Sequence, residues 1–352
     1  MMYGYNIKRG GDPLVSLHER MMRFFGQANV PLNWAVDVIP LLKYLPEGFP
    51  GSSFKKTARV YKKVRDASVG IPYSFCRRTT AESQRHSFVS ATVEMLGGES
   101  EISPENEAEM ELSAWASSVA GSDTLVTTIQ SVVLALVMFP EVQRKAHDEI
   151  DRVVGSKRLP GLEDRKNMPY IEAVAKEAFR WETVAPMGLP RLATEDLTYE
   201  GYLIPKGTIL LPAIRWFLHD PDTYKDPESF KPARYLDPLN EPDPSFAAFG
   251  YGRRKCPGMA YANRLVFLTI SRMLAVFDFS KAVDDNGIEI EVEAKAIPGL
   301  ALHLETFPCH VRPRSVERAE LVKNLCAGHD REESDDKAVQ QAVREAMGGQ
   351  WH

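Results

Sequence analysis

One cysteine stands in the stretch FGYGRRKCPG, among three glycines and three basic residues. Cys256 is one of four cysteines in the chain, and no two of them form a C-x-x-C pair. The sequence therefore spells out neither a zinc cluster nor a dithiol redox centre. A lone cysteine can be a nucleophile, a thiolate ligand for a metal, or a structural thiol in a turn.

The nucleophilic alternatives differ in what they require. A phosphatase-type nucleophile needs an arginine six positions after the cysteine, but that position is Ala262, so this chemistry is excluded. A cysteine-protease nucleophile needs a partner histidine. The chain has eight histidines, so this alternative stays open, as does a structural thiol.

The backbone around Cys256 favours a metal ligand. Pro257 is expected to be the first residue of the next helix, and a helix N-terminus favours a thiolate. Gly250, Gly252 and Gly258 let the backbone come close to a flat, bulky group.

Two side chains near Cys256 suit the same kind of ligand. Arg254 can hold a carboxylate by a bidentate fork, and Phe249 supplies an aromatic wall. These features together indicate a haem-binding site. The thiolate would bind the iron, the arginine would bind a propionate, and the glycine backbone and the aromatic side chain would lie against the macrocycle.

Helices are expected to carry these residues. Ser103 and Pro104 predict the start of a long helix that runs apolar through Phe139, where Pro140 ends it. Shorter helices are expected over residues 141–155 and towards Pro186, and an apolar helix follows Cys256. Residues 197–213 alternate with period two around two turn signals, which predicts a small antiparallel hairpin. The expected fold class is mainly α with minor antiparallel β.

Composition limits the function classes. The apolar content of 44% and charged content of 26% are those of a globular protein, and the net charge of −5 gives no support for a nucleic-acid partner. Few cysteines suit an intracellular compartment. The most apolar window, Leu125 to Phe139, is about four residues short of a membrane span, and no signal peptide opens the chain, so no transmembrane segment is expected.

In the stretch around Cys256 the sequence resembles the cytochrome P450 superfamily. Its haem signature, F-x-x-G-x-R-x-C-x-G, is matched at Phe249, Gly252, Arg254, Cys256 and Gly258. The resemblance implies haem b as cofactor, with Cys256 as the axial ligand of the iron. The stretch GYLIPKGT is most similar to microsomal family members from fungi, and this resemblance implies a role in secondary metabolism.

The stretch AGSDT within the long helix is similar to the family's acid–alcohol pair. The resemblance implies Thr124 beside dioxygen and Asp123 in the proton path, since a carboxylate followed by a hydroxyl can relay protons. An alternative reading is a helix break with Ser122 as a new N-cap.

The stretches EAFR and FKPARY resemble the family's structural triad. Glu177 and Arg180 are three apart on a helix and can pair on one face, and the resemblance adds Arg234 behind the haem. As a surface pair the first two would contribute little. The family often has glutamate where this chain has Ala233.

Other positions are implied by resemblance alone. Arg191 matches a position that commonly holds a haem propionate, and its alternative is a surface arginine. Two apolar segments and one helix residue correspond to the family's substrate lining, although the same residues would pass for plain core: Ala120, Val184, Ala185, Met187, Pro298, Gly299 and Leu300.

The resemblance covers roughly residues 1–318, which are expected to form one partial cytochrome P450 domain lacking the family's N-terminal part. The family's membrane anchor to the endoplasmic reticulum and its Trp-x-x-x-Arg propionate contact are expected to be missing. Residues 319–352 are charged and are expected to be a disordered or marginally helical tail.

The family resemblance implies a monooxygenase that inserts one atom of dioxygen into a small lipophilic substrate. Its electrons would come from NADPH through NADPH-cytochrome P450 reductase, docking on the Cys256 side. The alternatives are a truncated, inactive haem-binding or non-functional product, and a reductase-independent haem-thiolate isomerase or peroxygenase.

Overall fold

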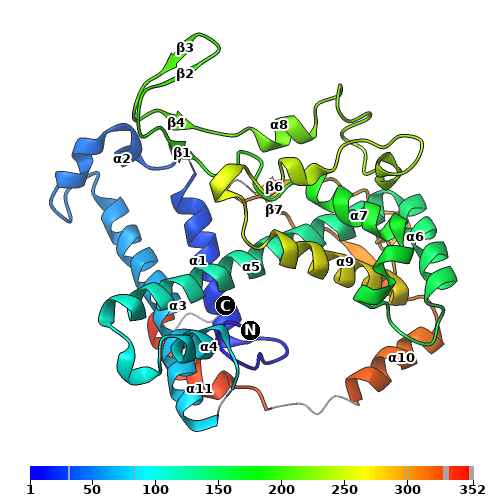
Figure 1. Ribbon diagram of the computed structural model, residues 1–352, viewed down its shortest axis with the longest axis horizontal. Coiled ribbons are helices and arrows are strands. Elements are labelled where there is room, and N and C mark those ends of the chain that lie inside the picture. The colour runs from blue at the N-terminus through cyan, green and yellow to red at the C-terminus, as the bar shows by residue number, and fades with distance from the viewer. Residues whose placement is uncertain (31, 84, 298, 300, 328–332, 349–352) are drawn as a thin grey trace. The chain divides into compact units, whose positions relative to one another are not determined.

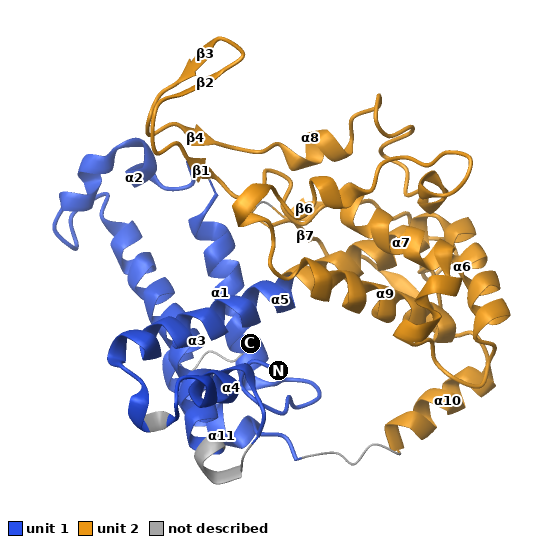
Figure 2. Cartoon of the chain, viewed as in Figure 1, with its two compact units in different colours: residues 1–123, 330–352 blue, residues 124–329 orange. Residues whose placement is uncertain are grey.

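The structure is a computed structural model that describes residues 1–30, 32–83, 85–297, 299, 301–327 and 333–348. It is mainly helical with short antiparallel strand pairs (Figure 1), as the sequence predicts. The chain forms two compact units (Figure 2). Unit 1 holds residues 1–123 and the described C-terminal residues 333–348, and unit 2 holds the described residues from 124 to 327.

Unit 1 is built from helices. They are α1 (Pro13–Ala28), α2 (Ala35–Val38), α3 (Ser53–Ser83), α4 (Phe88–Met95), the first part of α5 (Pro104–Met138) and α11 (Asp336–Met347). Asp12 caps α1, because its Oδ1 accepts hydrogen bonds from the backbone N–H of Leu14 at 2.9 Å and of Val15 at 3.2 Å. Leu14, Leu17 and Met21 then lie on one buried face of α1.

The C-terminal tail is helical, which is one of the two alternatives expected for it, but its boundary and its burial were not expected. The expected boundary after residue 318 falls inside α10 (Val316–Ala327), and α11 packs in unit 1 with Val339, Val343 and Met347 buried. These three residues repeat every four positions and form one apolar stripe, which the charged composition of the tail hides.

Unit 2 combines helices and strand pairs. Its helices are the rest of α5, α6 (Pro140–Val153), α7 (Pro169–Arg180), α8 (Ile214–Leu218), α9 (Met259–Val276) and α10. Its strands pair as β1 (Arg191–Leu192) with β4 (Ile209–Leu210), β2 (Leu197–Tyr199) with β3 (Tyr202–Ile204), β5 (Phe277–Lys281) with β8 (Cys309–Pro313), and β6 (Ala296–Ile297) with β7 (His303–Leu304).

The core of unit 2 lies among α5, α6, α7 and α9. Leu134 and Leu136 of α5 are fully buried with Ile150, Ile171 and Phe267 of the other helices. A buried side chain ties this core to the β5–β8 pair. Gln143 donates from Nε2 to the carbonyl of Phe279 at 3.1 Å and accepts the N–H of Phe279 at 2.8 Å.

The start and end of α5 match the sequence prediction. Ser103 Oγ accepts the N–H of Asn106 at 3.2 Å, Pro104 is the first helical residue, and Pro140 begins the next helix. Among the described residues, α5 alone is long and apolar enough to cross a membrane by length and composition, which the sequence analysis did not expect. Residues 132 and 134–137 of α5 lie in the core of unit 2, and a core helix passes the same test.

Two helix boundaries differ from expectation. The helix expected to reach Pro186 ends at Arg180, where Trp181 turns inward and donates from its indole N–H to the carbonyl of Glu228 at 2.8 Å. The helix expected from Pro257 begins at Met259, with Gly258 at its N-cap.

The expected hairpin is confirmed as β2 and β3. Glu200 and Gly201 join the strands with φ angles of +48° and +83°, the left-handed pair that a tight two-residue turn requires. Both of its tyrosines, Tyr199 and Tyr202, are exposed, and so is Leu203.

Candidate functional site

The backbone of residues 249–258 folds into a tight loop. The N–H of Cys256 donates to the carbonyl of Phe249 at 2.8 Å, and the N–H of Lys255 donates to the carbonyl of Gly252 at 3.1 Å. Gly250 and Gly252 have φ angles of +74° and +61°, which other residue types rarely adopt. The loop therefore needs glycine at these two positions for its path, and it leaves Cys256 exposed.

The loop is anchored at Phe249. Its ring packs against Phe179 of α7, with ring centroids 5.0 Å apart and planes tilted by 60°. At the other end, a Cβ on Gly258 would make an ordinary van der Waals contact with Cys256 Sγ, at 3.8 Å. Arg254 is exposed beside the cysteine. The loop thus holds its thiol between a core aromatic contact and the start of α9.

The structure brings Glu177, Arg180 and Arg234 together, and all three are fully buried. Arg180 donates from Nε and Nη2 to the two carboxylate oxygens of Glu177 at 2.8 and 2.9 Å. Arg234 donates from Nε to Glu177 Oε1 at 3.1 Å. The surface-pair alternative is therefore wrong for Glu177 and Arg180, since no solvent reaches either side chain.

Further groups complete this buried network. Tyr235 donates its O–H to Glu177 Oε2 at 2.8 Å, and the N–H of Lys231 donates to Oε1 at 2.8 Å. Arg234 also donates to Glu241 at 2.6 Å. The ring of Tyr224 lies beneath both guanidinium groups, 5.4 Å from Arg180 Cζ and 5.9 Å from Arg234 Cζ. None of these partners was predicted from the sequence, although Tyr235 stands in the stretch FKPARY.

The network sets the charge states of its members. Burial alone raises the pKa of the Glu177 carboxyl, but the hydrogen bond from Arg180 and the charges of both arginines outweigh burial, so the pKa lies below its ordinary value. Burial lowers the pKa of Arg234, and the charges of Glu177 and Glu241 outweigh it and raise the pKa. Glu177 is therefore an anion that its surroundings hold ionised.

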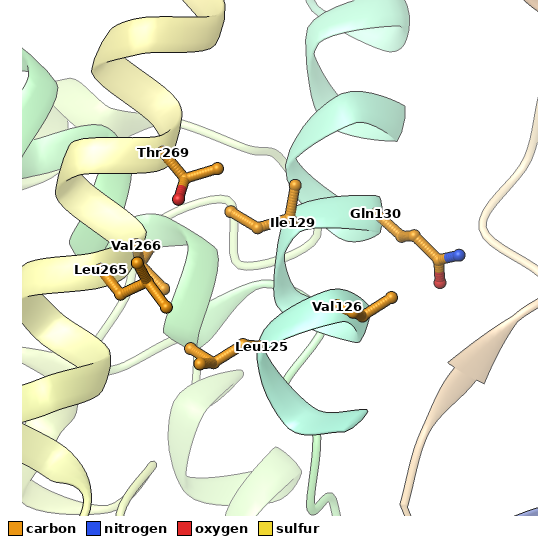
Figure 3. Close-up of a pocket in the computed structure, with 7 residues that line it drawn as sticks. All are labelled: Leu125, Val126, Ile129, Gln130, Leu265, Val266 and Thr269. Atoms are coloured by element: carbon orange, nitrogen blue, oxygen red, sulfur yellow. The ribbon is translucent and has the colours of Figure 1, made fainter. Parts of the chain in front are cut away.

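An apolar cavity of about 260 Å³ lies between α5 and α9 (Figure 3). Leu125 and Ile129 of α5 face Leu265 and Val266 of α9 across it, and Val126, Gln130 and Thr269 complete its lining. These lining residues were not predicted as a site from the sequence. Their signal is the helical spacing of apolar residues on the two helices, which plain core packing also produces.

The acid–alcohol stretch is helical throughout. Residues 120–124 lie inside α5, so the predicted alternative of a helix break at Ser122 is wrong. Ser122 donates its hydroxyl to the carbonyl of Val119 at 3.2 Å instead of capping a new helix. Thr124 directly precedes the cavity residue Leu125, while Ala120 and Asp123 belong to unit 1.

One of the expected substrate-lining residues, Val184, contacts the chain that follows the late turn. The N–H of Leu302 donates to the carbonyl of Val184 at 2.7 Å. Ala185 is half-buried and Met187 is exposed, as is Gly299. Pro298 and Leu300 lie outside the described residues. Arg191 lies in β1 with its side chain exposed.

Comparison with known proteins finds clear relatives. A family model described as Cytochrome P450 matches residues 13–301. The multifunctional cytochrome P450 monooxygenase af510 of Aspergillus fumigatus is 47% identical over 330 residues, which is 92% of this chain and 62% of that protein. Cytochrome P450 monooxygenase CLM2 of Gibberella zeae is 41% identical over 346 residues, which is 96% of this chain and 65% of that protein.

A third relative is a protein from another fungus. Cytochrome P450 monooxygenase claR of Ampulloclitocybe clavipes is 42% identical over 337 residues, covering 94% of this chain and 61% of that protein. The chain therefore spans less than two thirds of the length of each of these relatives.

Removal of the Glu177 charge tests the buried network. We expect Glu177→Gln to lower the free energy of unfolding by about 3 to 5 kcal/mol, because it leaves two buried guanidinium groups short of a counterion. Urea unfolding followed by circular dichroism measures the change. The control is Glu172→Gln on the same helix, whose carboxylate pairs with Arg165 in a partly exposed position and should contribute about 1 kcal/mol or less. Equal losses in the two variants would contradict the prediction.

The pH dependence of stability tests a neighbouring histidine. Burial and the charges of Arg215 and Arg180 lower the pKa of His219 to about 4. The unfolded chain therefore binds this proton at higher pH than the folded chain, so the stability contribution is complete above about pH 6.5 and falls between pH 6.5 and 4. We expect His219→Gln to reduce the fall of the urea midpoint between pH 7 and pH 5. An unchanged slope would contradict the assignment.

The contribution of Glu177 to stability changes in a more acidic pH range than that of His219. Because its folded pKa is depressed, its stabilisation is present above the ordinary glutamate pKa of about 4.3 and is lost as the pH falls below that value. The Glu177→Gln variant should therefore lose less stability than the wild type between pH 4.5 and pH 3 in the same measurement.

Proposed function

The chain belongs to the cytochrome P450 family, as its motifs predicted, and on that premise we propose that it is the catalytic part of a haem-dependent monooxygenase. The proposed reaction inserts one atom of dioxygen into an apolar organic substrate and reduces the other to water with two electrons and two protons. The observation that carries the proposal is the Cys256 loop, which presents an exposed thiol at the start of the helix that lines the apolar cavity.

The loop residues fit a haem. The described residues contain no group of three or more His, Cys, Asp or Glu side chains that could hold a bare metal ion. A single cysteine suits instead an iron that a macrocycle already binds through four nitrogens. A Cβ built at Gly250 or Gly252 meets no described atom within 4 Å, so this face of the loop is open to a flat group.

These positions support the proposed residue roles. Cys256 would hold the iron of haem b through its sulfur, and Phe249, Gly250, Gly252 and Gly258 would lie against the macrocycle. When bound, haem supplies the binding of dioxygen and the redox chemistry. Two exposed arginines, Arg254 and Arg191, are proposed to pair with the propionates.

Protons for the reaction are assigned to the α5 pair. We assign Thr124 to hold a hydrogen bond towards dioxygen and Asp123 to bring protons to the threonine hydroxyl. The position of Thr124 next to Leu125, a residue that lines the cavity, supports this assignment. Leu125 and Ile129 would exclude bulk water from the reacting side.

The substrate and partners belong to the same proposal. An apolar cavity and the apolar segments around Val184, Ala185 and Met187 suit a small lipophilic substrate, with Ala120, Pro298, Gly299 and Leu300 as further lining. Electrons are proposed to come from NADPH-cytochrome P450 reductase, docking on the Cys256 side, where Arg253, Arg254 and Lys255 are all exposed.

The proposed cellular setting is the membrane of the endoplasmic reticulum. Four free thiols suit an intracellular compartment, and the resemblance to microsomal enzymes suits the endoplasmic reticulum. The named relatives are fungal monooxygenases, and a role in fungal secondary metabolism accords with them.

Replacement of the proposed ligand tests the proposal directly. We expect Cys256→Ser to abolish the thiolate-type Soret band in the carbon monoxide difference spectrum of the reduced, haem-loaded protein. Cys326→Ser is the matched control and should leave the band unchanged, since Cys326 lies in α10. An unchanged band in Cys256→Ser, or no haem binding by the wild type, would refute the proposal.

The proton assignment has its own test. We expect Thr124→Ala to divert NADPH electrons from product to hydrogen peroxide, lowering the coupling ratio by about tenfold or more. Thr128→Ala is the control one turn along the same helix, because its hydroxyl donates to the carbonyl of Thr124 at 2.9 Å and is not assigned to proton delivery. Equal coupling in the two variants would count against the role of Thr124.

A further inference from the structure

The last helix of the described chain lies outside the family match. The match ends at residue 301, whereas α11 runs from Asp336 to Met347. It nevertheless belongs to unit 1 (Figure 2), where it contacts both α1 and α3. The segment 333–348, here named the C-terminal strap, therefore needs a physical explanation of its own.

The apolar stripe of the strap completes a core. Val339, Val343 and Met347 are buried in a cluster with residues of three other elements of unit 1. The partners from α1, α3 and α5 are Leu14, Leu17, Met21, Val64, Phe75 and Val119. Removal of the strap would expose the apolar partners of α1 and α3, so docking gains the free energy of burying them.

The N-terminal end of the strap is held by charge and by backbone. Asp335 pairs with Arg85 at 2.6 Å, and Asp336 pairs with Lys8 at 3.0 Å. The N–H of Asn6 donates to Asp335 Oδ2 at 2.8 Å, and the carbonyl of Asn6 accepts the N–H of Asp335 at 3.0 Å. The two acids also lie at the positive end of the helix dipole.

The C-terminal end of the strap meets cations from both helices beneath it. Lys63 of α3 donates to the carbonyl of Glu345 at 2.9 Å, and Arg20 of α1 donates to the carbonyl of Met347 at 3.4 Å. Cations at the last carbonyls of a helix complement its dipole and satisfy acceptors that lack an intrahelical partner. Complementary charges therefore hold the strap at both ends, and at its C-terminal end α1 and α3 each provide one cation.

One flank of the strap is open to solvent. A groove of about 260 Å³ lies between α3 and α11, and its lining includes Asp66 and Arg78 as well as the exposed Ala338 and Ala342. The strap is thus docked by a narrow apolar stripe and by its charged ends. A helix with few buried apolar contacts is one that can open locally.

We propose that the C-terminal strap is a reversible intramolecular clamp, which docks as an amphipathic helix across α1 and α3 and holds these two helices together. The occupant of this surface is the chain's own segment 333–348, because its spacing, its charges and both of its ends match the residues beneath it. Release of the strap exposes the apolar faces of α1 and α3 that it covers, so local stability of unit 1 depends on a segment remote in sequence.

Hydrogen exchange on the full chain tests the clamp. In the wild type, amides of α11 and of residues 14–21 in α1 should exchange slowly. Asp336→Lys and Lys8→Glu should each speed exchange in both segments by about fivefold or more, and the double variant Lys8→Glu/Asp336→Lys should recover most of the protection. Glu333→Lys is the matched control, since Glu333 is exposed at the same end of the helix and should change exchange little.

A second pair of variants tests the apolar stripe. Val343→Asp should remove protection from α11 and from residues 14–21, whereas Gln341→Asp, on the exposed face, should not. Fast exchange of α11 in the wild type, equal effects of Asp336→Lys and Glu333→Lys, or no recovery in the double variant would overturn the proposal. Protection of α11 that is lost on dilution would also overturn it, because the strap would then dock on a second copy.

Discussion

Burial of the Glu177 carboxylate is the constraint on which the candidate site depends. A lone buried carboxylate is costly, and here two arginines, a tyrosine and a backbone N–H all converge on it. Arg180 extends the network to the carbonyl of Leu218 at 2.9 Å, so α7 is fixed to α8. Since Phe249 packs on Phe179 of the same α7, the position of the cysteine loop follows from this buried charge network.

Short-range signals in the sequence predicted much of the fold and of the site. Ser103 with Pro104, and Glu200 with Gly201, gave a helix start and a turn, because capping and left-handed backbone depend on a few adjacent residues. The cysteine loop was predictable for the same reason, since its closing hydrogen bond joins residues only seven apart in the chain. The resemblance to the family's motifs then predicted which functions these local patterns have.

Long-range partners could not be predicted in this way. Tyr235 lies more than fifty residues after Glu177, and nothing in the spacing says which carboxylate it meets, while Arg234 was assigned to Glu177 through the family resemblance alone. The packing of the C-terminal helix was not predicted, because its three apolar residues are diluted by charge and their burial depends on partners at the other end of the sequence. The composition of this segment predicts how it behaves in isolation. Its structure in the protein depends on the apolar surface of α1 and α3, which the segment's own composition does not reveal.

The exposed hairpin has a practical consequence for handling the protein. Tyr199, Tyr202 and Leu203 lie on a two-stranded ribbon whose outer backbone groups face solvent. Such a ribbon is a template for intermolecular strand pairing, so concentrated samples should tend to aggregate there first. The charges of Glu200 at its tip and Lys206 just beyond it act as gatekeepers against that pairing, and solvent conditions that screen charge will weaken their protection.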